Sequence, residues 1–298
     1  MQSTQQIRRQ IQSTQNTSQI TKAMEMVAAS KMKKSQQAAL LARPYAEAAL
    51  NILQSVSESV EPTKHCLLEN REVQNLCLVV VTSDKGLCGG FNSSVLKEAQ
   101  KIVNANQNKT ISVIAIGKKA ENYFKKRNDI SAIFNGIGDT VELRETLPIS
   151  RLLINEFTEK KHDKIIAVYN NFISTIKQDV KVKKLLPITR RSLEETVEEI
   201  EDMTKGEYKE NNGIDYTFEP SASKVLCALL PNLVETQVYH IVLESNASEH
   251  SARMVAMKNA TDNAKEMLTD LKLLYNYIRQ QKITQEISEI SAGVAAQE

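Results

Sequence analysis

Residues 252–278 read ARMVAMKNATDNAKEMLTDLKLLYNYI, a stretch without glycine or proline in which apolar side chains return every three or four residues. The repeating positions are Ala252, Ala256, Ala260, Ala264, Met267, Leu271, Leu274 and Ile278, followed by Ile283, Ile287, Ile290 and Val294. This spacing indicates a helix with one narrow apolar stripe. Because Ser248 precedes the stretch and Glu249 would lie in the first turn, we expect the helix to begin with Ser248 as its N-cap.

The N-terminal end of the chain has the same character. Residues 1–60 contain no glycine, and Pro44 is their single proline. Apolar residues again recur at helical spacing, at Ile7, Ile11, Ile20, Met24, Val27, Leu41, Tyr45, Ala48, Ile52 and Val56. Proline disrupts a helix interior, so we expect Pro44 to kink or divide this helix. Two long helices with narrow apolar stripes at opposite ends of one chain predict an antiparallel coiled coil of residues 1–60 with residues 248–298.

The central residues 70–240 have a different pattern. Segments rich in β-branched residues predict strands at Leu76–Thr82, Ile111–Ile116, Ile165–Tyr169 and Val180–Ile188. Helices are expected between them, at about 93–104, 123–126 and 149–157, with a further helix over 220–240. This alternation predicts a small α/β domain with a parallel sheet. The acidic stretch within 192–216 is expected to be a loop.

Composition and charge argue against several classes of protein. The net charge of +2 gives no case for nucleic-acid binding, and the Gln-rich N-terminal helix lacks interleaved aromatic residues. The longest apolar run, Leu76–Val81, is far short of the roughly 20 residues that cross a bilayer. The four cysteines and four histidines form no CxxC, HExxH or HxH pair, so we expect no metal site. Residues 1–43 nevertheless carry seven Lys or Arg against one acid, Glu25, which indicates a solvated helix face or an acidic partner.

The sequence TSDKGLCGG at residues 82–90 is the sharpest candidate for chemistry. A glycine-rich turn between a strand and a helix can bind phosphate through its backbone N–H groups. Here the lysine precedes the first glycine and no Ser or Thr follows it, so neither the P-loop nor the dinucleotide fingerprint is present. Cys88 has no neighbouring His or second Cys that would activate it. We therefore expect a structural turn, built by Asp84, Lys85, Gly86, Gly89 and Gly90.

These patterns favour a mechanical or interaction protein that is not an enzyme and binds no cofactor. Two alternatives remain open from the residues alone. One is a coiled-coil scaffold or chaperone with an α/β head. The other is a nucleotide-dependent enzyme that uses the glycine turn.

Four segments carry a resemblance to a known family. They are 20–32 (ITKAMEMVAASKM), 82–92 (TSDKGLCGGFN), 248–264 (SEHSARMVAMKNATDNA) and 283–290 (ITQEISEI). In this order and spread along the chain, they resemble the gamma subunits of bacterial F-type ATP synthases. The tail at Ser291–Val294 departs from the Gly- and Ala-rich end usual in that family, and the regulatory dithiol insertion of the chloroplast form is missing.

The resemblance implies an antiparallel two-helix shaft with a central Rossmann-like α/β domain. It implies a non-catalytic central rotor that couples proton flow through a c-subunit ring to ATP synthesis or hydrolysis in a ring of alpha and beta subunits. An epsilon subunit would bind the α/β domain. The complex would hold this chain, as a peripheral protein, at the cytoplasmic face of the bacterial plasma membrane.

The resemblance also implies roles for individual residues. One group resembles positions near the acidic lever segments of the beta subunits: Lys22, Met24, Lys31, Lys33 and Lys34. A second group resembles positions that contact the surrounding ring or stabilise the shaft: Arg253, Arg279, Gln280, Thr284, Glu286 and Glu289. The small, mostly apolar tail at 290–296 would turn within an apolar sleeve.

Overall fold

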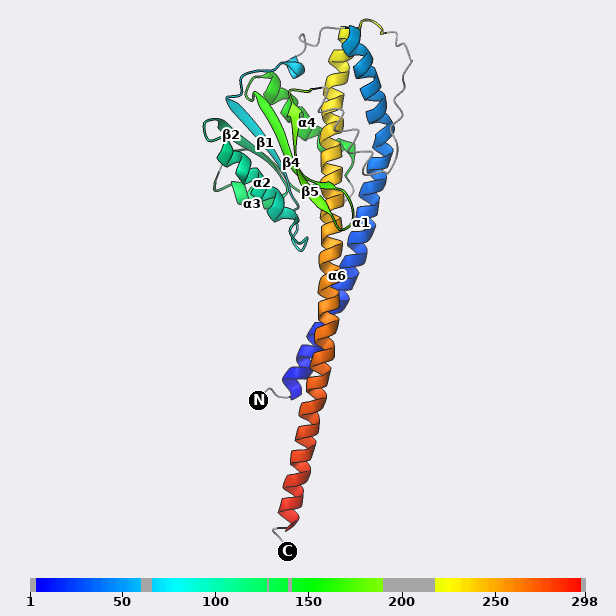
Figure 1. Cartoon of the computed structure of the whole chain (residues 1–298), viewed down its shortest axis with the longest axis vertical. Helices are drawn as coiled ribbons and strands as arrows, with labels where there is room; N and C mark the ends of the chain where they lie inside the picture. Colours follow the sequence, from blue (N-terminus) through cyan, green and yellow to red (C-terminus); the bar gives the residue numbers. More distant parts are fainter. Residues whose placement is uncertain (1–3, 60–65, 128, 139–140, 190–217, 296–298) are drawn as a thin grey trace. The chain divides into compact units, whose positions relative to one another are not determined.

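The computed structural model describes residues 4–59, 66–127, 129–138, 141–189 and 218–295 (Figure 1). The acidic stretch at 192–216 lies outside the described residues. The elements in chain order are α1 (Thr4–Ser59), η2 (Cys66–Leu68), β1 (Asn75–Val81), α2 (Phe91–Ala105), β2 (Thr110–Ile116), α3 (Lys118–Phe124), β3 (Asp129–Phe134), α4 (Leu143–Thr158), β4 (Lys164–Phe172), β5 (Gln178–Leu186) and α6 (Ala222–Ala295). Residues 1–27 and 254–298 form one compact unit, the helix-pair unit, and residues 28–253 form a second, the α/β unit.

In the helix-pair unit the start of α1 runs antiparallel to the second half of α6. The Thr21 and Thr261 hydroxyls lie 2.8 Å apart, and the Thr14 hydroxyl lies 4.0 Å from the Met267 sulfur. Thr14 of α1 contacts Met267 of α6, and Thr21 contacts Thr261, so the residue numbers increase in opposite directions along the two helices. This confirms the antiparallel pairing predicted from the two stripes.

The position of the seam differs from the prediction by one residue. Ile20, which the spacing assigned to the apolar stripe, is 59% exposed, whereas the neighbouring Thr21 is buried. The Thr21 and Thr261 hydroxyls lie within hydrogen-bonding distance of each other and of the Ser18 and Met257 carbonyls of their own helices, and their two protons make two of these three bonds at a time. Because each hydroxyl has a partner, two polar residues are tolerated where a purely apolar stripe was expected.

This threonine pair gives a first prediction. Thr21→Val should lower the free energy of unfolding of the helix-pair unit by about 1 kcal/mol, because the Thr261 hydroxyl loses its cross-helix partner. The double variant Thr21→Val/Thr261→Val should recover most of that loss, since two apolar groups of the same shape replace the bonded pair. Urea unfolding followed by helical circular dichroism measures both. Thr17→Val, at an exposed hydroxyl bonded to Ser13, is the control and should change stability by under about 0.5 kcal/mol. A double variant that loses as much as the sum of the two singles would contradict the prediction.

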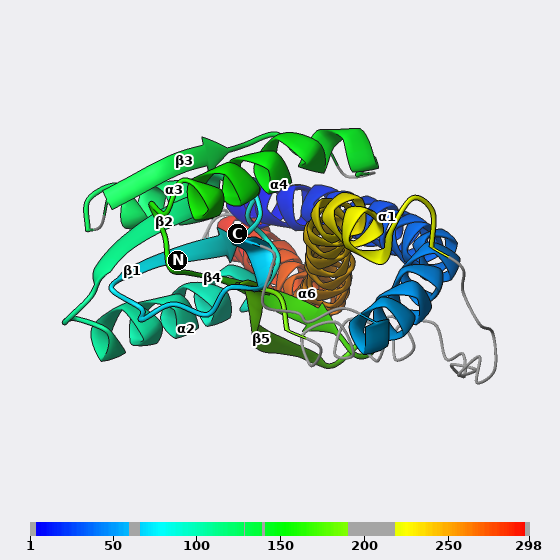
Figure 2. The same cartoon turned by 90° about the horizontal axis from the view of Figure 1, so that it is seen from above.

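The α/β unit is built on a five-stranded sheet of order β3-β2-β1-β4-β5, which can be followed in Figure 2. β1 pairs in parallel with β2 and β4, and β2 pairs in parallel with β3. The predicted parallel sheet is confirmed for β1 to β4, and β5 is the exception, because it pairs antiparallel with β4. The connection from Phe172 to Gln178 is too short for the crossover that a parallel neighbour requires, so a hairpin forms instead. β3 was not predicted at all.

Both faces of this sheet are covered by helices. Leu76, Leu78 and Val80 of β1 face α2 and α3, in a cluster that includes Val95 and Phe124. The alternate β1 residues, from Cys77 to Val81, face α4 and the first part of α6. A central strand buried on both sides needs apolar residues at every position, which is why β1 reads as an unbroken apolar run.

α6 corrects the expectation that the C-terminal helix begins at Ser248. The helix is continuous from Ala222, and Ser248 is a fully buried interior residue whose hydroxyl donates to the Asn170 carbonyl at 3.2 Å. The first part of α6 buries Leu226, Leu230 and Val234 against the sheet, which holds the chain helical well before Ser248. Pro44 likewise lies within α1 and does not divide it.

α6 is also the one described helix that is long and apolar enough to cross a membrane, by length and composition alone. Polar residues interrupt the apolar stretch of α6 that passes this test, so it contains no long unbroken apolar run. Of the residues in this apolar stretch, 56% are buried inside the protein, as in the core helix of a globular domain. The apolar stretch of α6 is therefore weak evidence for a membrane span.

Candidate functional site

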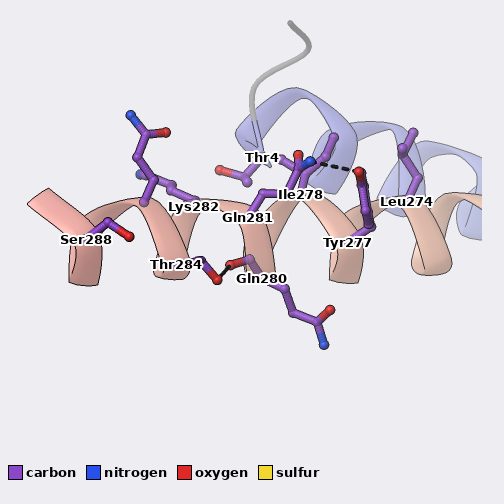
Figure 3. A pocket seen from close by; sticks show the side chains of 10 residues that line it. Thr4, Leu274, Tyr277, Ile278, Gln280, Gln281, Lys282, Thr284 and Ser288 are labelled. Carbon is purple, nitrogen blue, oxygen red and sulfur yellow. Dashed lines mark hydrogen bonds between the residues drawn. The ribbon is translucent and has the colours of Figure 1, made fainter.

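The C-terminal part of α6 exposes a row of apolar side chains. The exposed fractions are 65% for Leu273, 59% for Tyr277, 47% for Ile283, 59% for Ile287, 68% for Ile290 and 58% for Val294. The described part of α1 begins at Thr4, which lies beside Tyr277 and Ile278 (Figure 3). We call residues 273–294 the exposed apolar segment. Apolar surface of this extent on a helix indicates contact with another protein.

A groove of about 1000 Å³ lies where α1 begins against this segment. Leu274, Tyr277 and Ile278 supply its apolar wall, and the Gln281 amide donates to the Tyr277 hydroxyl at 2.8 Å (Figure 3). Gln280, Thr284 and Gln285 add polar groups to its lining. The groove thus mixes apolar surface with hydrogen-bonding groups and one charged residue, Lys282, which suits contact with a protein surface.

Five of the residues that the resemblance assigned to ring contact lie on the exposed apolar segment: Arg279, Gln280, Thr284, Glu286 and Glu289. All five are exposed. The Thr284 hydroxyl donates to the Gln280 carbonyl, Glu286 lies 3.8 Å from the Lys282 ammonium, and Glu289 accepts from the Gln285 amide. These bonds stay within one helix and leave the outer surface open to a partner.

The assigned α1 residues divide between the two units. In the helix-pair unit, Met24 is half-buried and Lys22 forms an exposed ion pair with Glu25 at 3.0 Å. In the α/β unit, Lys33 and Lys34 are exposed and Lys31 is half-buried. The assignment omitted Met26 and Val27, which expose 58% and 53% of their surfaces. Met26 lies within the quoted 20–32 motif but off the predicted stripe, so its apolar character was the signal that could have identified it. Val27 was expected in the stripe, and its exposure corrects that expectation.

The glycine turn after β1 is held by the Asp84 carboxylate. Its Oδ1 accepts from the Lys118 N–H at 3.0 Å, and its Oδ2 accepts from the Gly136 N–H at 2.9 Å. Lys118 is the first residue of α3, where an external anion would otherwise find free N–H donors. Because Asp84 accepts from both groups, it ties the turn after β1 to the start of α3 and to the segment after β3.

The rest of the turn is bonded internally as well. The Asn92 side chain accepts from the Ser83 N–H at 3.0 Å and donates to the Cys88 sulfur at 3.1 Å. Lys85, Gly86, Gly89 and Gly90 are exposed, and Gly89 has φ +55°, which glycine adopts without strain. All five residues expected to build the turn therefore lie in it, between β1 and α2.

Arg253, the remaining residue assigned to ring contact, lies in the α/β unit against the turn. Its guanidinium donates to Glu249 at 2.6 Å and to the Gly86 carbonyl at 3.3 Å, and it lies 3.2 Å from His250 Nδ1. Only 10% of its side chain is exposed. In this structure Arg253 ties α6 to the turn, and its contact with a surrounding ring stays a prediction.

Asp84 gives a second prediction. Asp84→Ala should lower the free energy of unfolding of the α/β unit by about 1–2 kcal/mol, because two backbone N–H groups lose their acceptor. Asp84→Asn keeps one acceptor oxygen and should lose about half as much. Chemical denaturation measures the loss. Glu98→Ala is the control, because Glu98 pairs with Lys101 on the surface of α2 and such pairs contribute little. Equal stabilities for Asp84→Ala and Glu98→Ala would contradict the role given to Asp84.

The fold and these surfaces define a class of protein: an α/β domain joined to a pair of long helices whose exposed end is suited to a protein partner. A family model described as ATP synthase matches residues 3–297. The ATP synthase gamma chain of Roseiflexus castenholzii is 44% identical over 301 residues, covering 99% of both chains, and that of Desulforamulus reducens is 40% identical over 299 residues, covering 100% of both. The chain belongs to the ATP synthase gamma-chain family.

Solved structures agree with this assignment. A chain of the mitochondrial ATP synthase central stalk and c-ring of Tetrahymena thermophila has a TM-score of 0.60 and 27% identity, covering 81% of this chain and 99% of that one. A chain of the Euglena gracilis mitochondrial ATP synthase rotor has a TM-score of 0.61 over 94% of this chain and 98% of that one. At 17% identity the second likeness shows the fold alone.

Proposed function

We propose that this chain is the central rotor subunit of an F-type ATP synthase and is not itself a catalyst. Full-length membership of the gamma-chain family is the observation that carries the proposal. The related Tetrahymena chain comes from a central stalk and c-ring assembly, which favours the same neighbours here. These relatives do not favour the scaffold or chaperone alternative.

In this function the exposed apolar segment turns inside a ring of alpha and beta subunits. Apolar contacts are non-directional, so they exclude water without fixing one rotational angle as salt bridges would. The charged and polar residues from Arg279 to Glu289 give the segment different chemistry on its different sides. A rotor shifts the conformation of each beta subunit only through contacts that differ between its sides, because equal contact with every state shifts no equilibrium.

The α/β unit would rest on the c ring and bind the epsilon subunit, so that proton flow through the ring turns the chain. Its place would then be the cytoplasmic face of the bacterial plasma membrane, as a peripheral part of the complex. The basic residues Lys22, Lys31, Lys33 and Lys34 and the apolar Met24 would meet acidic segments of the beta subunits.

Copurification tests the assignment directly. The tagged chain should bring down alpha, beta and epsilon subunits in an ATP-hydrolysing complex that pumps protons in membrane vesicles. Met24→Lys should lower proton pumping per ATP hydrolysed, because it places a charge where an apolar side chain meets the lever segments. Met24→Leu is the control and should retain coupling. Recovery of the chain without alpha and beta subunits would overturn the rotor assignment, and normal coupling in Met24→Lys would remove Met24 from the contact.

A further inference from the structure

Three side chains with metal-binding atoms meet inside the α/β unit, near the amino-terminal ends of β1 and β4. The glycine turn lies at the other end of β1. Cys77 lies near the start of β1, Glu156 lies near the end of α4, and His162 lies just before β4. Their sulfur, nitrogen and oxygen atoms all lie within 4.8 Å of one another, and all three residues are buried. The cluster plays no part in the rotor surfaces described above.

One carboxylate oxygen of the cluster makes no hydrogen bond among the described residues, although the His162 ring lies within ion-pair distance of it. His162 Nε2 lies 3.2 Å from Glu156 Oε2 and 3.3 Å from the Ser112 hydroxyl. Glu156 Oε1 accepts from the Ser131 hydroxyl at 3.0 Å, which orients the carboxylate. Glu156 Oε2 is buried and has no hydrogen-bond partner among the described residues. Buried polar atoms without a partner are rare and point to a missing ligand.

We propose that Cys77, Glu156 and His162 bind a divalent metal ion of the zinc type. Thiolate, imidazole and carboxylate are the three ligand types of zinc sites, which often hold three protein ligands and a water. Tetrahedral zinc holds its ligand atoms about 3.5 Å apart. The Nε2–Oε2 pair at 3.2 Å already has a suitable separation, and every pair of ligand atoms in the cluster lies within 4.8 Å.

Charge also favours a divalent ion at this position. One thiolate and one carboxylate balance a 2+ ion, so the loaded site is neutral where water is largely excluded. The thiol proton leaves to solvent as the Cys–metal bond forms. Such an ion would link β1, α4 and the segment before β4, and would stabilise the α/β unit by binding the folded state alone.

The sequence patterns predicted no metal site because the three ligands have no short spacing. Parallel pairing sets Cys77 of β1 beside Ser112 of β2, and Cys77 beside Ile165 of β4, close to His162. Only the folded sheet and α4 bring the three ligands together.

Cobalt titration of the full chain tests the proposal. The chain carries Cys66→Ser and Cys227→Ser to remove the two exposed thiols, and is first freed of metal with a chelator. One Co²⁺ per chain should bind with a thiolate-to-cobalt charge-transfer band, and Zn²⁺ should displace it. Cys77→Ser should abolish the band, and His162→Gln and Glu156→Gln should weaken binding by more than about tenfold. Cys88→Ser, at the other buried thiol, is the matched control and should bind as the parent does.

Folding of each variant is checked by circular dichroism, and the two Gln variants keep the test valid if Cys77→Ser does not fold. Saturating Zn²⁺ should also raise the Tm of the parent by about 5 °C or more, and excess chelator should reverse the rise. A parent without a charge-transfer band would overturn the proposal. So would folded Gln variants that bind Co²⁺ as tightly as the parent, or a band that depends on Cys88 rather than Cys77.

Discussion

Gly117→Ala is expected to destabilise the α/β unit by more than about 4 kcal/mol, a loss reached only by severe clashes or buried unpaired groups. Gly117 has φ +90°, and a Cβ atom there would lie 2.2 Å from the Thr82 carbonyl oxygen and 2.8 Å from its carbonyl carbon. Both atoms are backbone, so no side-chain rotation relieves the contact. The Gly117 N–H also donates to the Phe134 carbonyl at 2.8 Å, which ties the turn to the end of β3.

Alanine substitutions at two other glycines separate the steric clash from the strain of a positive φ. Gly136 has φ +76° with no atom near its Cβ position, so Gly136→Ala carries only the backbone strain of about 1–2 kcal/mol. Gly86 has neither the positive φ nor a neighbour, so Gly86→Ala should be neutral within about 1 kcal/mol. Urea unfolding of the full-length variants gives the order Gly86, Gly136, Gly117 for increasing loss. A Gly117→Ala protein no less stable than Gly136→Ala would contradict the prediction, because it would show that the backbone at Thr82 moves away from the added Cβ atom at little cost.

The sequence identified most elements of this fold because their burial is extreme. β1 and β4 are buried on both faces and therefore read as apolar runs, and each of the two long helices contains a single proline, Pro44 in α1 and Pro231 in α6. β3 was missed because it is a short edge strand, in which only Ile130, Ala132 and Phe134 are partly buried. Its alternation was the available signal, and six residues make a weak one.

Errors within predicted elements arose where polar residues are buried. Helical spacing placed Ile20 in the seam, but the mutual hydrogen bond of Thr21 and Thr261 places Thr21 there. Ser248 has the chemistry of an N-cap, but its hydroxyl bonds to a carbonyl of β4 inside a continuous helix. In each case a tertiary hydrogen bond decided the position, and such partners are distant in sequence.

The candidate site was predictable in unequal parts. The spacing around Gly86 differs from the nucleotide motifs and predicts a structural turn, and the Asp84 carboxylate ties this turn to Lys118 and Gly136. The exposed apolar segment followed from the stripe continuing to Val294, although periodicity could not show that α1 leaves it uncovered. The Cys77 cluster was invisible, because its ligands come from separate elements.

Arg253→Ala is expected to cost the α/β unit about 3 kcal/mol, because it removes a largely buried guanidinium that donates to both the Glu249 carboxylate and the Gly86 carbonyl. The Glu249 side chain is 14% exposed, and it and the Gly86 carbonyl would both lose their donor. Arg253→Lys keeps the charge but not the planar fork that reaches both acceptors, so we expect an intermediate loss. Urea unfolding of the full chain measures the series.

A double-mutant cycle distinguishes the ion pair from simple packing. Glu249→Gln alone should destabilise the α/β unit. The double variant Glu249→Gln/Arg253→Ala should cost less than the sum of the two single losses, because it removes both charges of the pair together. Lys101→Ala removes an exposed pair with Glu98 and should change stability by under about 0.5 kcal/mol. Strict additivity of the Arg253 and Glu249 losses would mean that the guanidinium stabilises α6 against the turn through its packed stem rather than through its charge. The reach of Arg253 to Gly86 would then matter less than the apolar contacts that hold α6 on the sheet.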